Sequence, residues 1–123
     1  MLLRKATCVV VFCGLELCPV APVQAGFYSG NVLFEICMTA RDDPAYFEKS
    51  YECAAYISGA VDAFNSTREA NKLKSCIPAD VTINQLRDVT VDYLRAKPTG
   101  RAKSASALVF AAVRKAWPCS RKK

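Results

Sequence analysis

Four cysteines that follow an N-terminal export signal are the feature that most constrains the fold of this chain. They are Cys37, Cys53, Cys76 and Cys119. In a short exported domain, an even number of cysteines is typical of a disulfide framework, because the oxidising compartment keeps such bridges formed. A domain of this size buries a limited core, so covalent links contribute a large share of its stability. The sequence therefore predicts a small domain stapled by two disulfides.

The export signal has three recognisable parts. Arg4 and Lys5 provide its positive start, residues 6–15 form a short apolar stretch, and Val23-Gln24-Ala25 offers a small-residue cleavage site. The apolar stretch is too short to cross a bilayer as a helix. We therefore expect residues 1–25 to be a signal peptide and residues 26–123 to be the mature, extracytoplasmic domain.

The chain contains no histidine, which narrows its possible chemistry. The usual nucleophile and base pairings cannot be built without it, and neither can the common zinc sites. The carboxylate pairs Asp42–Asp43 and Asp88–Asp92 fit helix caps or a solvated helix face better than a catalytic centre. We expect no enzymatic activity, no metal and no cofactor.

The charge is strongly basic, with a formal net charge of +6. Part of it is concentrated in two clusters, at Lys97–Lys103 and at Arg121–Lys123. Basic clusters often bind nucleic acid, but an exported protein rarely meets any. An acidic protein partner or an anionic envelope surface fits the compartment better, and simple solubility is the plain alternative.

Helical periodicity divides the mature chain into four segments. The first follows a cap at Ser29 or Asn31. The second is expected from an Asp43–Pro44 start to about Phe64, followed by a polar connection over residues 65–78. Its apolar stripe is expected to face the core and consists of Phe47, Tyr51, Ala54, Ile57, Val61 and Phe64. A second stripe of small residues would let another helix approach closely, or would form a dimer seam; it consists of Ala55, Gly59 and Ala63.

The third and fourth segments have clear boundaries. Thr82 and Gln85 form a capping box, Pro98 and Gly100 interrupt the third helix, and Ser104 can cap a fourth helix over residues 105–117. Trp117 is expected in the core. No stretch alternates with the period of a strand, so the predicted fold class is all-α: a disulfide-stapled bundle of about four helices.

Four cysteines allow three connectivities. A short connection between the first two helices would bring Cys37 near Cys53, and an antiparallel hairpin around residues 98–100 would bring Cys76 near Cys119. We therefore favour these two pairs, with the larger loss of stability expected when the second is removed.

The cysteines belong to an ordered set of motifs that extends over almost the whole mature chain. The set comprises Gly30-Asn31-x-Leu33 to Cys37, Cys53-x-x-Tyr56-Ile57-x-Gly59-x-x-Asp62-Ala63, Cys76-Ile77-Pro78-x-x-Val81-Thr82-x-x-Gln85-Leu86-x-Asp88-Val89, Tyr93-Leu94, Pro98, Ala105, Leu108-Val109 and Trp117-Pro118-Cys119. This set resembles the Rap/Tai family of type VI secretion immunity proteins. The chain departs from the family at Trp117, where phenylalanine is common, and in its 97–103 loop, which lacks a histidine.

The resemblance implies a periplasmic helical protein that protects a Gram-negative cell from a peptidoglycan-cleaving toxin. Toxins countered by this family are amidases or endopeptidases with a cysteine nucleophile. The resemblance also implies a homodimer that blocks the toxin's substrate cleft by direct contact, without inserting into the membrane.

Two basic segments are the candidates for contact with a partner. The first is the predicted hairpin tip, with candidate contact residues Lys97, Thr99, Gly100, Arg101 and Lys103. The second is the 65–74 connection, which carries Arg68, Lys72 and Lys74. Two other functions stay open at this point: a periplasmic stress chaperone, and an envelope-binding structural protein.

Overall fold

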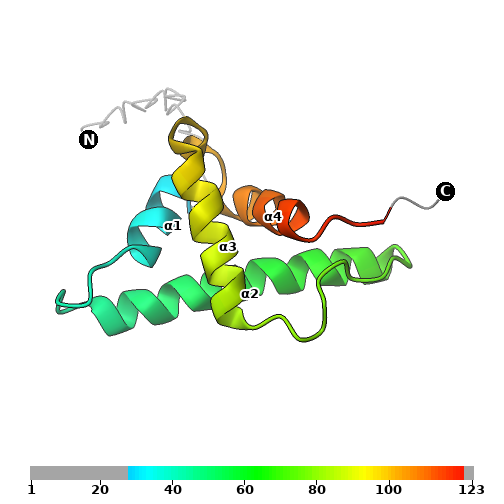
Figure 1. Cartoon of the computed structure of the whole chain (residues 1–123), viewed down its shortest axis with the longest axis horizontal. Coiled ribbons are helices and arrows are strands. Elements are labelled where there is room, and N and C mark those ends of the chain that lie inside the picture. Colours follow the sequence, from blue (N-terminus) through cyan, green and yellow to red (C-terminus); the bar gives the residue numbers. More distant parts are fainter. Residues whose placement is uncertain (1–27, 121–123) are drawn as a thin grey trace, which may run out of the picture.

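A computed structural model describes residues 28–120 of the chain, so the expected signal peptide lies outside the described residues. These residues form four α-helices and one short 3-10 helix, which confirms the predicted all-α class. The helices are α1 (Gly30–Cys37), α2 (Tyr46–Ala70), α3 (Ile83–Ala96), η1 (Pro98–Ala102) and α4 (Ala105–Ala116). Helix α2 lies across the lower part of the molecule in Figure 1, with α1 and α4 on one side of it and α3 crossing it.

Side-chain caps begin two of the helices as the sequence predicts. Ser29 Oγ accepts a hydrogen bond from the backbone amide of Val32, at 3.3 Å, and so caps α1. At α3, the Thr82 amide donates to Gln85 Oε1 at 2.7 Å and the Gln85 amide donates to Thr82 Oγ1 at 3.3 Å, completing the predicted capping box. Ser104 precedes α4, but its hydroxyl lies 3.0 Å from Ser106 Oγ and caps no amide.

The predicted limits of the second helix were wrong at both ends. Asp43 Oδ1 accepts from the amide of Ala45 at 2.8 Å in the turn before the helix, and α2 begins only at Tyr46. At the other end α2 continues to Ala70, six residues beyond the predicted end at Phe64. Polar residues there suggested a loop, but hydrogen bonds from Thr67 and Asn71 side chains to helix carbonyls accompany the extra turns.

Part of α2 that was predicted to be buried is exposed. Phe47 and Tyr51 are each 75% exposed, although their spacing placed them on the buried stripe. The small residues Ala55, Gly59 and Ala63 are exposed as well, and a Cβ at Gly59 would meet nothing within 4 Å. No helix of this chain covers that face among the residues described, so the expected close helix approach within the chain was wrong.

The core lies between α2 and the other three helices. Its fully buried large side chains are Leu33, Ile57, Leu94, Val109, Val113, Thr90 and Cys53. Trp117, expected in the core, is half-buried and packs against the core from outside. None of the helices in the described part of the chain is long and apolar enough to cross a membrane.

Both predicted disulfides are confirmed. Cys37 and Cys53 join α1 to α2, with a Cα–Cα distance of 5.1 Å, and both residues belong to the core. Cys76 and Cys119 join the segment before α3 to the segment after α4, at 5.0 Å. The second bridge therefore links the two free ends of the α3–α4 pair, while η1 connects the two helices at the other end (Figure 1).

An arginine makes a further link between α1 and α3. Arg87 Nη2 donates to the carbonyl oxygen of Cys37 at 2.7 Å. This carbonyl belongs to the last residue of α1, where the helix carbonyls have no partner within the helix and a positive charge is favourable. Nothing in the sequence pattern singled out this contact.

Candidate functional site

The tip of the α3–α4 hairpin is the first candidate site, and it contains all five predicted contact residues. Lys97 ends α3, η1 carries the next residues, and Lys103 leads into α4. Lys97, Thr99 and Lys103 are exposed, whereas Gly100 and Arg101 are half-buried. The tip therefore presents two ammonium groups and one hydroxyl to a partner.

The backbone of the tip is fixed against the start of α1. The amide of Gly30 donates to Lys103 O at 2.9 Å, and the amide of Ala105 donates to Tyr28 O at 2.7 Å. Between these bonds, Ser29 and Ser104 form an isolated antiparallel bridge. The approach is close, since a Cβ on Gly30 would lie 2.9 Å from the carbonyl oxygen of Arg101. The tip is thus a rigid feature of the fold.

Two of the tip's cations rest on aromatic rings. The Arg101 guanidinium lies 4.2 Å from the centre of the Phe34 ring, and its Nε is buried without a hydrogen-bond acceptor among residues 28–120. Lys97 Nζ lies 4.9 Å from the centre of the Tyr93 ring. Arg101 therefore anchors the tip to α1, which leaves Lys97, Thr99 and Lys103 better placed for contact.

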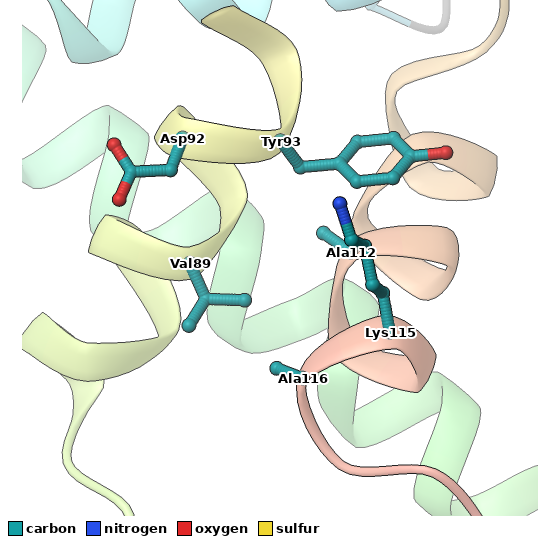
Figure 2. Close-up of a pocket in the computed structure, with 6 residues that line it drawn as sticks. All are labelled: Val89, Asp92, Tyr93, Ala112, Lys115 and Ala116. Carbon is teal, nitrogen blue, oxygen red and sulfur yellow. The ribbon is translucent and has the colours of Figure 1, made fainter. Parts of the chain in front are cut away.

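A shallow groove of about 280 Å³ begins beside the tip, between α3 and α4. Its lining residues are Val89, Asp92, Tyr93, Ala112, Lys115 and Ala116. Tyr93 reaches from α3 toward α4, whereas Asp92 points away from α4 (Figure 2). Because Tyr93 lines the groove and also supports Lys97, the tip and the groove form one continuous surface.

This surface is predominantly basic, and Asp92 is the one carboxylate among the described residues that line the groove. In the sequence, the segment from Tyr93 to Lys123 contains nine Lys and Arg residues and no Asp or Glu. Clustered charge of one sign attracts partners of the opposite sign and rejects others. This run without acidic residues extends well beyond the two clusters that the sequence analysis singled out.

The candidate carboxylate pair on α3, Asp88 and Asp92, has ordinary structural partners. Asp88 lies 3.6 Å from Arg87 Nη1, and Asp92 pairs with Arg95; both carboxylates are exposed. Residues 28–120 contain no group of three or more His, Cys, Asp or Glu side chains that could hold a metal ion. The exposed charged side chains of residues 28–120 are suited to contact with the surface of a partner.

Sequence reasoning missed one polar contact near the start of α1. The Tyr28 hydroxyl donates to Glu52 Oε1 on α2, and the Tyr28 ring stacks on Tyr56 at 5.1 Å. The hydrogen bond from Tyr28 lowers the pKa of the Glu52 carboxyl, with help from nearby Lys49. The available signal in the sequence was Glu52, a charged residue directly before the buried Cys53, which indicates that its carboxylate has a partner.

The second candidate segment lies where α2 ends. The structure places Arg68 within the helix and Lys72 and Lys74 in the turn that follows, around a hollow separate from the tip. Arg68 Nε donates to Lys74 O at 2.8 Å, so the turn folds back on the helix.

Comparison with models of known protein families identifies the family of this chain. A family model described as Rap1a immunity proteins matches residues 29–119, which include both disulfides, the tip and the groove. The chain belongs to this immunity family. The resemblance to the Rap/Tai family is therefore confirmed, and with it the general role of an immunity protein for a secreted effector. No curated protein and no solved structure matches the chain.

Proposed function

We propose that this immunity protein acts in the periplasm, where it binds a peptidoglycan-cleaving type VI effector and blocks its substrate cleft. The hairpin tip, with exposed Lys97, Thr99 and Lys103, is the proposed inhibitory element. Two disulfides are typical of an exported domain and support this location. The effector class, an amidase or endopeptidase, follows from the resemblance stated above.

The observation that carries the proposal is the rigid attachment of an exposed basic tip. The hydrogen bond from Gly30 to Lys103 O and the stack of Arg101 on Phe34 order the tip before any partner arrives. Preordering reduces the entropy lost on binding, so more of the contact energy appears as affinity. Such an element inhibits by occlusion and requires no chemistry of its own.

The test begins with a pull-down from periplasmic extract, using the mature, oxidised protein to isolate a peptidoglycan hydrolase. The double variant Lys97→Glu/Lys103→Glu should then bind that hydrolase at least 100-fold more weakly and should fail to protect cells that export it. Arg114→Glu is the matched control, because this exposed residue of α4 changes charge by the same amount per site away from the tip. Full protection by the double variant would place the inhibitory contact elsewhere.

We also propose that the protein forms a homodimer through the outer face of α2. In the described part of the chain Phe47 and Tyr51 are the most exposed large apolar residues, and they continue the line of Ala55 and Gly59 along the same helix. Sedimentation of a Phe47→Glu/Tyr51→Glu variant tests this seam. A monomer is expected for the variant and a dimer for the parent; a monomeric parent would contradict the proposal.

A further inference from the structure

A basic hollow of about 470 Å³ lies where α2 ends, apart from the hairpin tip. Its lining residues are Arg68, Lys72, Leu73, Lys74, Ser75, Cys76, Pro118 and Ser120. Three of them are cations and none is a carboxylate. In Figure 1 the turn after α2 and the segment after α4 lie together at one side of the molecule, while η1 lies at the far end of α3.

Arg68 is oriented in this hollow by its own turn. Its Nε donates to Lys74 O at 2.8 Å, and its carbonyl oxygen accepts from the Leu73 amide at 2.9 Å. The guanidinium also lies 5.8 Å from the centre of the Phe64 ring. These contacts leave its two terminal nitrogens without an acceptor among residues 28–120. A guanidinium fixed in this way presents a ready fork to an oxyanion.

The turn adds two ammonium groups to the same hollow. Lys72 has φ of 57°, which is unusual for a residue with a side chain and is the only positive φ outside glycine in the described chain. This conformation folds residues 72–74 back beside Arg68. The Cys76–Cys119 disulfide then ties the turn to the segment after α4, so both walls of the hollow are covalently joined.

We propose that this hollow is a binding site for a phosphate-class oxyanion. One guanidinium fork would suffice for a single carboxylate. Here Arg68, Lys72 and Lys74 line one hollow that has no acidic residue in its described lining, which matches a group with more than one negative charge. The group can be free phosphate or a phosphate monoester on a lipid headgroup. The site is separate from the tip, so this inference does not depend on the proposed inhibitory contact.

Titration with inorganic phosphate, followed by amide NMR of the oxidised mature protein, tests the site. Trp117 is the only tryptophan in the chain and directly precedes Pro118 in the lining, so its fluorescence offers a second readout. We expect saturable shifts centred on residues 68–76. The Lys72→Gln/Lys74→Gln variant should bind at least tenfold more weakly, and Arg68→Lys, which keeps the charge but loses the fork, should be intermediate.

Arg95→Gln is the control, because it removes one exposed cation near the tip end of α3. It should bind phosphate like the parent. Both Lys72 and Lys74 are exposed, so their double variant should keep the parent's melting temperature and its protection against the effector. Retained protection with lost phosphate binding would separate this site from the proposed inhibitory function.

Further binding measurements distinguish a free phosphate from a lipid headgroup and define the results that would contradict the site. Vesicles of neutral lipid with phosphatidic acid should bind the parent if the ligand is a lipid headgroup, whereas binding of inorganic phosphate alone indicates a free anion. Three results would overturn the site: no saturable shift with phosphate, equal binding by the Lys72→Gln/Lys74→Gln variant, or acetate binding as tight as phosphate at matched ionic strength.

Discussion

The backbone amide of Gly30 donates a 2.9 Å hydrogen bond to the carbonyl oxygen of Lys103, which joins the first turn of α1 to the end of the hairpin tip. The two segments come this close because Gly30 has no side chain. A Cβ built there would lie 2.3 Å from Leu108 Cδ1 and 2.9 Å from Arg101 O. The position of the tip is therefore linked to one residue far away in sequence.

Gly30→Ala should destabilise the protein by about 1–3 kcal/mol, because the new methyl group meets backbone as well as a side chain. It should also weaken effector binding by displacing the tip. Thermal unfolding and calorimetry measure the two effects. Gly59→Ala is the control within a single copy of the chain, compared at a protein concentration where the parent is monomeric. A Cβ there would meet nothing within 4 Å in the described chain, and alanine favours a helix interior, so a gain of about 0.5–1 kcal/mol is expected. Equal effects of the two variants would contradict this account.

Thr90→Val should increase stability by about 1 kcal/mol. Thr90 is 0% exposed, and its Oγ1 has no hydrogen-bond partner among the residues described. A buried hydroxyl without a partner loses its hydration with no compensation, and valine has nearly the same shape. Urea denaturation measures the change. Thr90→Ser retains the hydroxyl and removes the methyl group, so it should be less stable than the parent; a loss with valine would reveal an unrecognised partner.

Dilute reductant should open Cys76–Cys119 before Cys37–Cys53. Cys76 and Cys119 are half-buried, whereas Cys37 and Cys53 both belong to the core. Loop separations of 43 and 16 residues predict entropic contributions of about 4 and about 3 kcal/mol respectively. Timed alkylation with mass spectrometry reports the order of opening, and thermal unfolding of the alkylated intermediate reports the loss of stability. The reverse order would contradict the burial argument.

Stability should fall at both ends of the pH range through the Tyr28–Glu52 hydrogen bond. That bond lowers the pKa of Glu52 below its ordinary value of 4.5, so the stability it contributes is present above pH 4.5 and is lost as the pH falls through the lower folded pKa. It also raises the pKa of Tyr28 above 10.0. The corresponding stability is present below pH 10.0 and is lost as the pH rises through the higher folded pKa.

Tyr28→Phe removes the hydrogen bond and keeps the ring that stacks on Tyr56. Urea midpoints measured between pH 3 and pH 11 should therefore fall less steeply for this variant at both ends, while Tyr46→Phe should follow the parent. Identical profiles for Tyr28→Phe and the parent would show that the bond contributes no pH dependence.

Local signals in the sequence predicted much of the fold. The Thr82–Gln85 box, the Ser29 cap and the Pro98–Gly100 break depend on interactions within a few residues, so they can be recognised without a tertiary structure. The cysteine pairs also followed from local geometry, since each pair joins helices connected by a short turn or a hairpin.

The features that the sequence did not predict depend on contacts between segments far apart in the chain. Periodicity showed that α2 has an apolar stripe, but it did not show that three helices cover only part of α2 and leave Phe47 and Tyr51 exposed. The five tip residues were predicted as a group. The contact of Arg101 with Phe34, however, joins residues far apart in the sequence and has no sequence signature. The Arg87 bond to Cys37 O escaped prediction for the same reason.

The two disulfides also determine how simply the chain can mature. Counted along residues 28–120, the first cysteine pairs with the second and the third with the fourth. In the proposed periplasmic location, and with residues 1–25 removed as expected, a chain that emerges from a translocation channel with its N-terminus first can oxidise each pair as it appears. Under the same proposal Cys37–Cys53 can close before Cys76 and Cys119 emerge, so the order of emergence favours the observed pairing.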